Sequence, residues 1–111
     1  MKNLITALIV SLSATVQANA DTHCSAAAAA YNQARSTVKP GPDTCEATLK
    51  QAISLMKKSR NAADDCGCAE LTDQLDTFLT RLRNGKSSCF DKSQGIMLYD
   101  AQFADLISAC R

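Results

Sequence analysis

The sequence has few of the residues and motifs on which catalysis depends. It contains one histidine, His23, no glycine-rich phosphate loop and no Cys-x-x-Cys-His motif for covalent haem attachment. A serine or cysteine nucleophile needs a nearby base, and the one histidine lies near the N-terminus. Asp64 and Asp65 are paired carboxylates, but adjacent side chains diverge on a helix, which favours a capping role. We therefore expect no enzymatic activity and no cofactor.

The chain also lacks an excess of charge of either sign. It has 12 Lys and Arg against 11 Asp and Glu, and beyond residue 20 the two numbers are equal. A nucleic-acid binder needs a basic footprint, and a polybasic membrane-surface protein needs a cluster of cations. No stretch after residue 20 is long and apolar enough for a membrane helix. We therefore expect no nucleic-acid partner and no membrane span.

The first twenty residues predict a secretory signal peptide. Lys2 supplies the positive charge, residues 4–12 are apolar, and residues 18–20 (Ala-Asn-Ala) fit the small-x-small cleavage pattern. The apolar run is too short to span a bilayer, and a buried N-terminal helix is the alternative. We expect residues 21–111 to form a single helical, disulfide-rich domain in the periplasm or outside the cell.

All six cysteines follow the predicted cleavage site. An even number in a short exported chain predicts a disulfide framework, and a small core gains much from cross-links. Free or metal-bound thiols are the alternative. The intervals between successive cysteines are 21, 21, 2, 21 and 21 residues, and the positions are Cys24, Cys45, Cys66, Cys68, Cys89 and Cys110.

This spacing divides the chain into two halves of 43 residues each, 24–66 and 68–110. Laying one half on the other places Gly41 on Gly85, although identity elsewhere is low. The pattern predicts a repeated supersecondary unit, with chance spacing as the alternative. The first half carries a net charge of +2 and the second −2, and opposite signs favour docking of the halves.

The second half has the periodicity of a helical hairpin. Asn84 and Gly85 end its first helix, Ser88 with Asp91 can cap the next, and Gly95 is expected to kink or delay that helix. The apolar stripe of the first helix is Leu71, Leu75, Phe78, Leu79 and Leu82. The inner face of the second is Ile96, Tyr99, Phe103, Leu106 and Cys110.

The first half repeats this pattern more weakly. Residues 40–42 (Pro-Gly-Pro) separate two helices, and Asp43 with Glu46 resembles a capping box. The stripe before the break is Ala27, Tyr31, Ala34 and Val38. The stripe after it is Leu49, Ala52, Ile53 and Met56. No segment alternates as a strand would.

Four helices with short connections predict an all-α fold, a disulfide-stapled antiparallel four-helix bundle made of two similar helical hairpins. Alternating helix ends would gather four cysteines at one end and two at the other. The preferred pairs are Cys24–Cys66, Cys68–Cys110 and Cys45–Cys89. The main competitor pairs Cys24 with Cys68 and Cys66 with Cys110, whereas a Cys66–Cys68 ring would be strained.

Two features could bind metal. After the predicted cleavage, Asp21, Thr22 and His23 would resemble the amino-terminal Cu(II)/Ni(II) motif of serum albumins. The terminal amine, two deprotonated backbone amides and the imidazole would supply four nitrogens in a plane, which suits both metals.

The second feature is the segment 66–68 (Cys-Gly-Cys). Closely spaced cysteines can bind soft metals or exchange disulfides, and Cys24 and Cys110 could complete a four-thiolate site. A tight turn between two hairpins, flanked by structural cysteines, is the favoured interpretation.

These features favour a small exported, non-catalytic binding module that contacts another periplasmic or extracellular protein, as an inhibitor, immunity or accessory protein does. Loops 39–43 and 84–87 are candidate contact surfaces, and both are equally well explained as solvated connections. One alternative is a periplasmic copper-binding or thiol-redox protein that uses residues 21–23 and the Cys66–Cys68 segment. Another is a small periplasmic chaperone.

Overall fold

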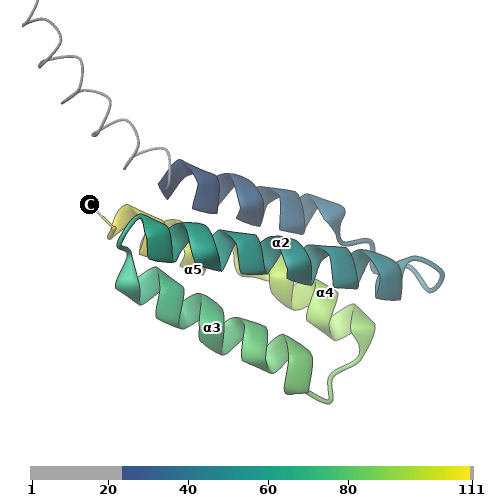
Figure 1. Ribbon diagram of the computed structural model, residues 1–111. Coiled ribbons are helices and arrows are strands. Elements are labelled where there is room, and N and C mark those ends of the chain that lie inside the picture. The colour runs from purple at the N-terminus through teal and green to yellow at the C-terminus, as the bar shows by residue number, and fades with distance from the viewer. Residues whose placement is uncertain (1–23, 111) are drawn as a thin grey trace, which may run out of the picture.

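The computed structural model describes residues 24–110, and these residues form helices and no strand. A helical segment, residues 24–37, precedes α2 (Cys45–Asp65), α3 (Ala69–Asn84), α4 (Cys89–Leu98) and α5 (Asp100–Ser108). Figure 1 shows α2 between the segment 24–37 and α3, with α4 and α5 behind it. The predicted all-α class is confirmed.

Two of the three predicted disulfides are present. Cys45–Cys89 joins the first residues of α2 and α4. Cys68–Cys110 joins the N-cap of α3 to the chain just beyond α5. The continuous pair α4–α5 is therefore attached to α2 at one end and to the start of α3 at the other.

The remaining predicted pair is Cys24–Cys66. Cys66 is partly buried at the end of α2, and its Sγ donates to the carbonyl oxygen of Ala63 at 3.3 Å. The pairing of Cys24 with Cys66 stays a prediction.

The turns that separate the helices follow local chemistry. Gly67, between α2 and α3, has a φ of 81°, a conformation that favours glycine. At Gly85 an added Cβ would lie 2.5 Å from the carbonyl oxygen of Arg81, so this close approach also requires glycine. The predicted cap of α4 is confirmed, because Asp91 N–H donates to Ser88 Oγ at 3.1 Å.

Two expectations about local structure are wrong. The N-cap of α2 is Thr44 rather than Asp43, and its hydroxyl donates to the carbonyl oxygen of Lys39 at 2.9 Å, so it closes the preceding loop instead of capping the helix. Gly95 lies inside α4, and the interruption comes at Tyr99, between α4 and α5. The helical dihedral angles of Tyr99 make this break a slight one.

The core is built from one face of each helical segment. Among its members, Tyr31, Met56, Leu71, Leu75 and Ile96 are fully buried. The predicted stripes supply most of the core, with four members only partly buried: Ile53, Phe78, Leu106 and Cys110.

Polar groups in the core are paired across segments. Tyr31 Oη donates to the carbonyl oxygen of Ile96 at 3.0 Å, and Ser59 Oγ donates to that of Ala27 at 2.7 Å. These bonds tie the segment 24–37 to α4 and to α2. Buried hydrogen bonds of this kind also fix the axial position of one helix against the next.

Ion pairs join the basic half of the chain to the acidic half. Arg35 Nη1 lies 2.8 Å from Asp100 Oδ2, and Arg60 Nε lies 2.9 Å from Asp76 Oδ1. In both pairs the cation comes from residues 24–66 and the anion from residues 68–110. The side chains are partly exposed, so each pair adds little stability and serves mainly to orient the helices.

Candidate functional site

The two predicted metal sites have different outcomes. Asp21, Thr22 and His23 lie outside the described residues. The alternative four-thiolate site fails because Cys68 and Cys110 are bonded to each other. Within residues 24–110 no group of three or more His, Cys, Asp and Glu side chains is arranged to hold a metal ion.

The two loops named as contact surfaces are exposed. In the first, Lys39 N–H donates to Thr48 Oγ1 at 3.0 Å, which ties the loop to α2 while residues 41–43 face solvent. In the second, residues 84–87 are all exposed. Neither loop presents a large hydrophobic side chain, so neither has the usual character of an interface centre.

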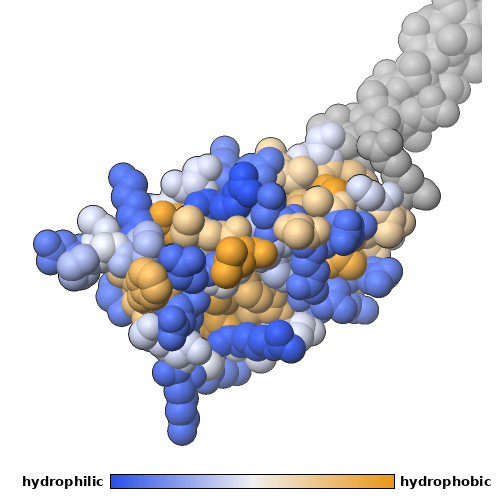
Figure 2. Space-filling model, turned by 180° about the vertical axis from the view of Figure 1, so that it is seen from behind, coloured by the Kyte–Doolittle hydropathy of each residue, from blue (hydrophilic) through white to orange (hydrophobic). Residues whose placement is uncertain are grey.

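The large exposed hydrophobic side chains of the described residues all lie on α4. Phe90 is 52% exposed, Met97 39% and Leu98 76%. Phe90 and Met97 are seven residues apart, close to two helical turns, so they share a face, and Leu98 adjoins it. We call these three residues the α4 stripe. On the back of the molecule, hydrophobic atoms reach the surface at several points between hydrophilic side chains (Figure 2).

Helix α4 buries few of its residues. Its buried residues are Ser93 and Ile96 only. Ser93 Oγ lies 3.4 Å from Cys45 Sγ, beside the first disulfide. Helix α4 therefore contributes one large apolar side chain to the core and leaves three in solvent, an arrangement that core packing does not explain.

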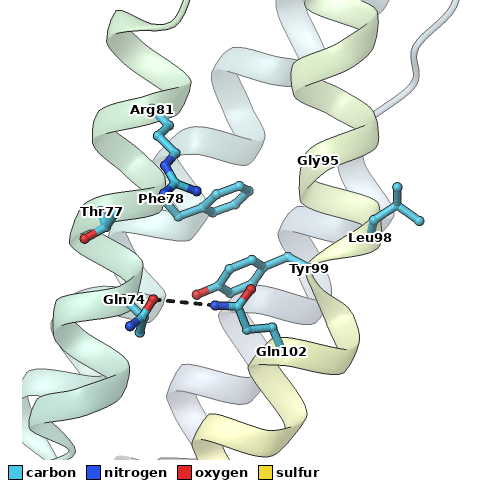
Figure 3. Close-up of a pocket in the computed structure, with 8 residues that line it drawn as sticks. All are labelled: Gln74, Thr77, Phe78, Arg81, Gly95, Leu98, Tyr99 and Gln102. Atoms are coloured by element: carbon cyan, nitrogen blue, oxygen red, sulfur yellow. Dashed lines mark hydrogen bonds between the residues drawn. The ribbon is translucent and has the colours of Figure 1, made fainter.

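A cavity of about 220 Å³ lies between α3 and the α4–α5 junction (Figure 3). We call it the Tyr99 pocket. Its lining residues are Gln74, Thr77, Phe78, Arg81, Gly95, Leu98, Tyr99 and Gln102. Leu98 belongs to both the pocket and the α4 stripe, although its side chain points away from the pocket interior.

Stacked aromatic rings position Tyr99. The Phe78 and Tyr99 ring centroids are 4.4 Å apart with an interplanar angle of 11°. Tyr31, which stacks on Phe103 at 4.3 Å, also approaches Tyr99, with 6.1 Å between ring centroids. Such contacts add to the stabilisation from burial and hold the Tyr99 ring in one orientation.

The hydroxyl of Tyr99 is buried and has no hydrogen-bond partner. Burial raises the pKa of Tyr99, and the nearby Arg81 lowers it in part. Burial likewise raises the pKa of Tyr31, to about 12. Both hydroxyls thus carry their proton at neutral pH, but only that of Tyr31 has an acceptor for it.

A second and more open cavity, of about 530 Å³, lies between α2, the end of α3 and α4. Its apolar members include Leu49, Ile53 and Leu82. Its charged members are Glu46, Lys50, Arg83 and Lys92. No buried polar atom without a partner marks this cavity within the described residues, unlike the Tyr99 pocket.

The sequence predicted that Phe78 and Tyr99 belong to apolar core stripes. In the structure Tyr99 is buried and Phe78 is partly buried against the core. The sequence did not reveal the pocket, because an unpaired hydroxyl depends on neighbours that are distant in sequence. The α4 stripe, in contrast, can be detected in the sequence. Phe90, Met97 and Leu98 all fall outside the inner face predicted for that helix.

Comparison of the chain with family models, with curated proteins and with solved structures found no match. In the part of the chain that the structure describes, no helix is both long and apolar enough to cross a membrane.

Proposed function

We propose that this protein is a small exported binding module, without catalytic activity, whose α4 stripe contacts another protein of the periplasm or the extracellular space. The exposure of Phe90, Met97 and Leu98 together on one short helix carries the proposal. Single exposed hydrophobic residues are ordinary on protein surfaces, whereas a group of them marks an interaction site.

The attachment of α4 supports this role. Cys89 ties the start of α4 to α2, and Cys110 ties the end of α5 to the start of α3. A partner that binds the stripe would meet a helix already held in place. The entropy cost of ordering that surface is then met during folding and does not weaken the complex. Helix faces of this kind are a common means of protein recognition.

The cysteine chemistry supports the proposed location. Disulfides persist in oxidising compartments and are rare where glutathione keeps thiols reduced. The signal sequence predicted in residues 1–20 would deliver the chain to such a compartment. An inhibitor, immunity protein or accessory factor of the cell envelope fits these properties.

Photo-crosslinking in the native compartment tests the proposal. A photoreactive residue placed at position 90 or 97 should give one adduct of defined mass with a different protein. The matched control at Asn61, which is exposed on α2, should give none. The double variant Phe90→Ser/Met97→Ser should lose the partner while its helical circular dichroism remains unchanged.

Other adduct patterns would contradict the proposal. A broad smear of adducts from the α4 positions would indicate a small chaperone, which the same exposed stripe would also suit. An adduct of twice the chain mass would indicate self-association. Equal labelling from positions 61 and 97 would show that the stripe is not a specific surface.

A further inference from the structure

The hydroxyl of Tyr99 is a hydrogen-bond donor without an acceptor. Tyr99 is 7% exposed, and its hydroxyl is fully buried without a hydrogen bond. A buried polar group left in this state costs about 1–3 kcal/mol. Figure 3 shows the Tyr99 ring reaching from the α4–α5 junction toward α3, so that its hydroxyl lies beside Gln74. The group is thus directed across the pocket and not into an apolar wall.

A cation without a partner lines the same pocket. Arg81 makes no side-chain hydrogen bond or ion pair within residues 24–110, whereas Arg35 and Arg60 are both paired. Figure 3 shows its guanidinium turned down from α3 toward the pocket. No carboxylate lines the pocket, so Arg81 is its one charged member among the described residues.

We propose that the Tyr99 pocket binds a small organic carboxylate. One oxygen of the ligand accepts from Tyr99 Oη, and the carboxylate pairs with the guanidinium of Arg81. Guanidinium groups match carboxylates in shape and charge, and hydrogen bonds to an ionised acceptor are stronger than neutral ones.

The charge and size of the pocket narrow the ligand class. One cation balances one carboxylate, while a phosphate group would bring a charge of about −1.5 to −2. The volume of about 220 Å³ is below the range of roughly 300–1,000 Å³ typical of sites for drug-sized ligands. The half-buried ring of Phe78 offers one apolar wall among mostly polar lining side chains, so the apolar part of a short aliphatic or aromatic acid can lie against it.

A weak contact between two glutamines covers the hydroxyl. Gln102 Nε2 lies 3.5 Å from Gln74 Oε1, at the limit of hydrogen-bond length, and both side chains are exposed (Figure 3). Parting these side chains costs little and opens a path to Tyr99. The amide groups then provide further donors to the bound carboxylate. This inference does not depend on the partner proposed for the α4 stripe.

Titration of the oxidised protein with butyrate and benzoate tests the site. The sequence contains no tryptophan and two tyrosines, so tyrosine fluorescence reports directly on Tyr31 and Tyr99. Side-chain amide signals of Gln74 and Gln102 in NMR spectra give a second, local measure. We expect saturable binding with a Kd of about 1 mM, and binding of butyramide and of inorganic phosphate about tenfold weaker.

Matched variants separate this site from general charge attraction. Tyr99→Phe and Arg81→Gln should each weaken butyrate binding about tenfold. Arg83→Gln makes the same charge change on α3 outside the pocket and should leave the affinity unchanged. Tyr99→Phe keeps the ring and removes only an unpaired hydroxyl, so loss of binding cannot be assigned to unfolding.

Three results would overturn the inference. The first is the absence of saturable binding of either acid at 50 mM, well above the Kd of about 1 mM expected for so small a ligand. The second is equal binding of butyrate and butyramide, which would remove the role of charge. The third is an equal effect of Arg81→Gln and Arg83→Gln, which would place the anion outside the pocket.

Discussion

Helices α3 and α4 differ in how many of their large apolar side chains are buried. In α3 the buried residues are Leu71, Thr72, Leu75, Leu79 and Leu82, and the exposed ones other than Ala69 are polar or charged. In α4 the buried residues are Ser93 and Ile96, while Phe90, Met97 and Leu98 are exposed. Helix α3 thus contributes mainly to the core, whereas α4 presents most of its large apolar side chains at the surface, where we propose that a partner binds.

The difference extends to what holds each helix. Helix α3 packs against α2, and its four buried leucines belong to the common core. Helix α4 depends on the Cys45–Cys89 bridge and on the hydrogen bond from Tyr31 to the carbonyl oxygen of Ile96. Helix α4 buries one large apolar side chain, that of Ile96, and α3 buries four leucines, so the covalent and polar attachments matter more for α4.

Removal of the Cys45–Cys89 bridge by a double change to alanine should have the largest effect. The bridge spans a sequence separation of 44, and its loss should lower the free energy of unfolding by about 4 kcal/mol. Urea unfolding followed by circular dichroism measures the loss. Hydrogen exchange should show that α4 loses protection before α3. Uniform loss along the chain would contradict the proposed difference between the helices.

Truncation of one leucine in each helix compares them directly. Leu75→Ala removes a fully buried side chain of α3 and should cost about 3 kcal/mol. Leu98→Ala removes a side chain that is 76% exposed and should change the free energy of unfolding by less than about 0.5 kcal/mol. Thermal unfolding of both variants measures the two costs. Similar costs would mean that α4 contributes to the core after all.

Removal of the hydroxyl group from each of the two buried tyrosines should change the free energy of unfolding in opposite directions. Tyr31→Phe loses the hydrogen bond to Ile96 and should lower the free energy of unfolding by about 1 kcal/mol. Tyr99→Phe removes an unpaired hydroxyl and should raise it by about 1 kcal/mol. Paired urea titrations of the two variants give the difference. A destabilised Tyr99→Phe protein would show that a water or a protein group already pairs with the hydroxyl.

The helical content and two of the disulfides could be predicted because both depend on spacing along the chain. Leucines recurring at helical intervals identify α3, and cysteines at helix ends become neighbours once the helix directions alternate. The confirmed pairs, Cys45–Cys89 and Cys68–Cys110, follow from that reasoning.

The features that escaped prediction depend on contacts between distant residues. The hydroxyl of Thr44 donates to the carbonyl oxygen of Lys39 instead of capping α2, because the loop before α2 brings these two residues together. The break between α4 and α5 falls at Tyr99, whose ring stacks on Phe78 of α3. The residues around Gly95 give no sequence signal for a break at this position. The Tyr99 pocket likewise needs Arg81, Tyr99 and Gln102 to be brought together by the fold.

The arrangement of the two disulfides determines what a single proteolytic cleavage does to the molecule. With Cys45 bonded to Cys89 and Cys68 to Cys110, the bridged pairs interleave along the chain. A single backbone cut anywhere between Cys45 and Cys110 then leaves both fragments in one covalent molecule. A nick in the exposed turn before α4 would sever the chain without releasing the helix that carries the α4 stripe.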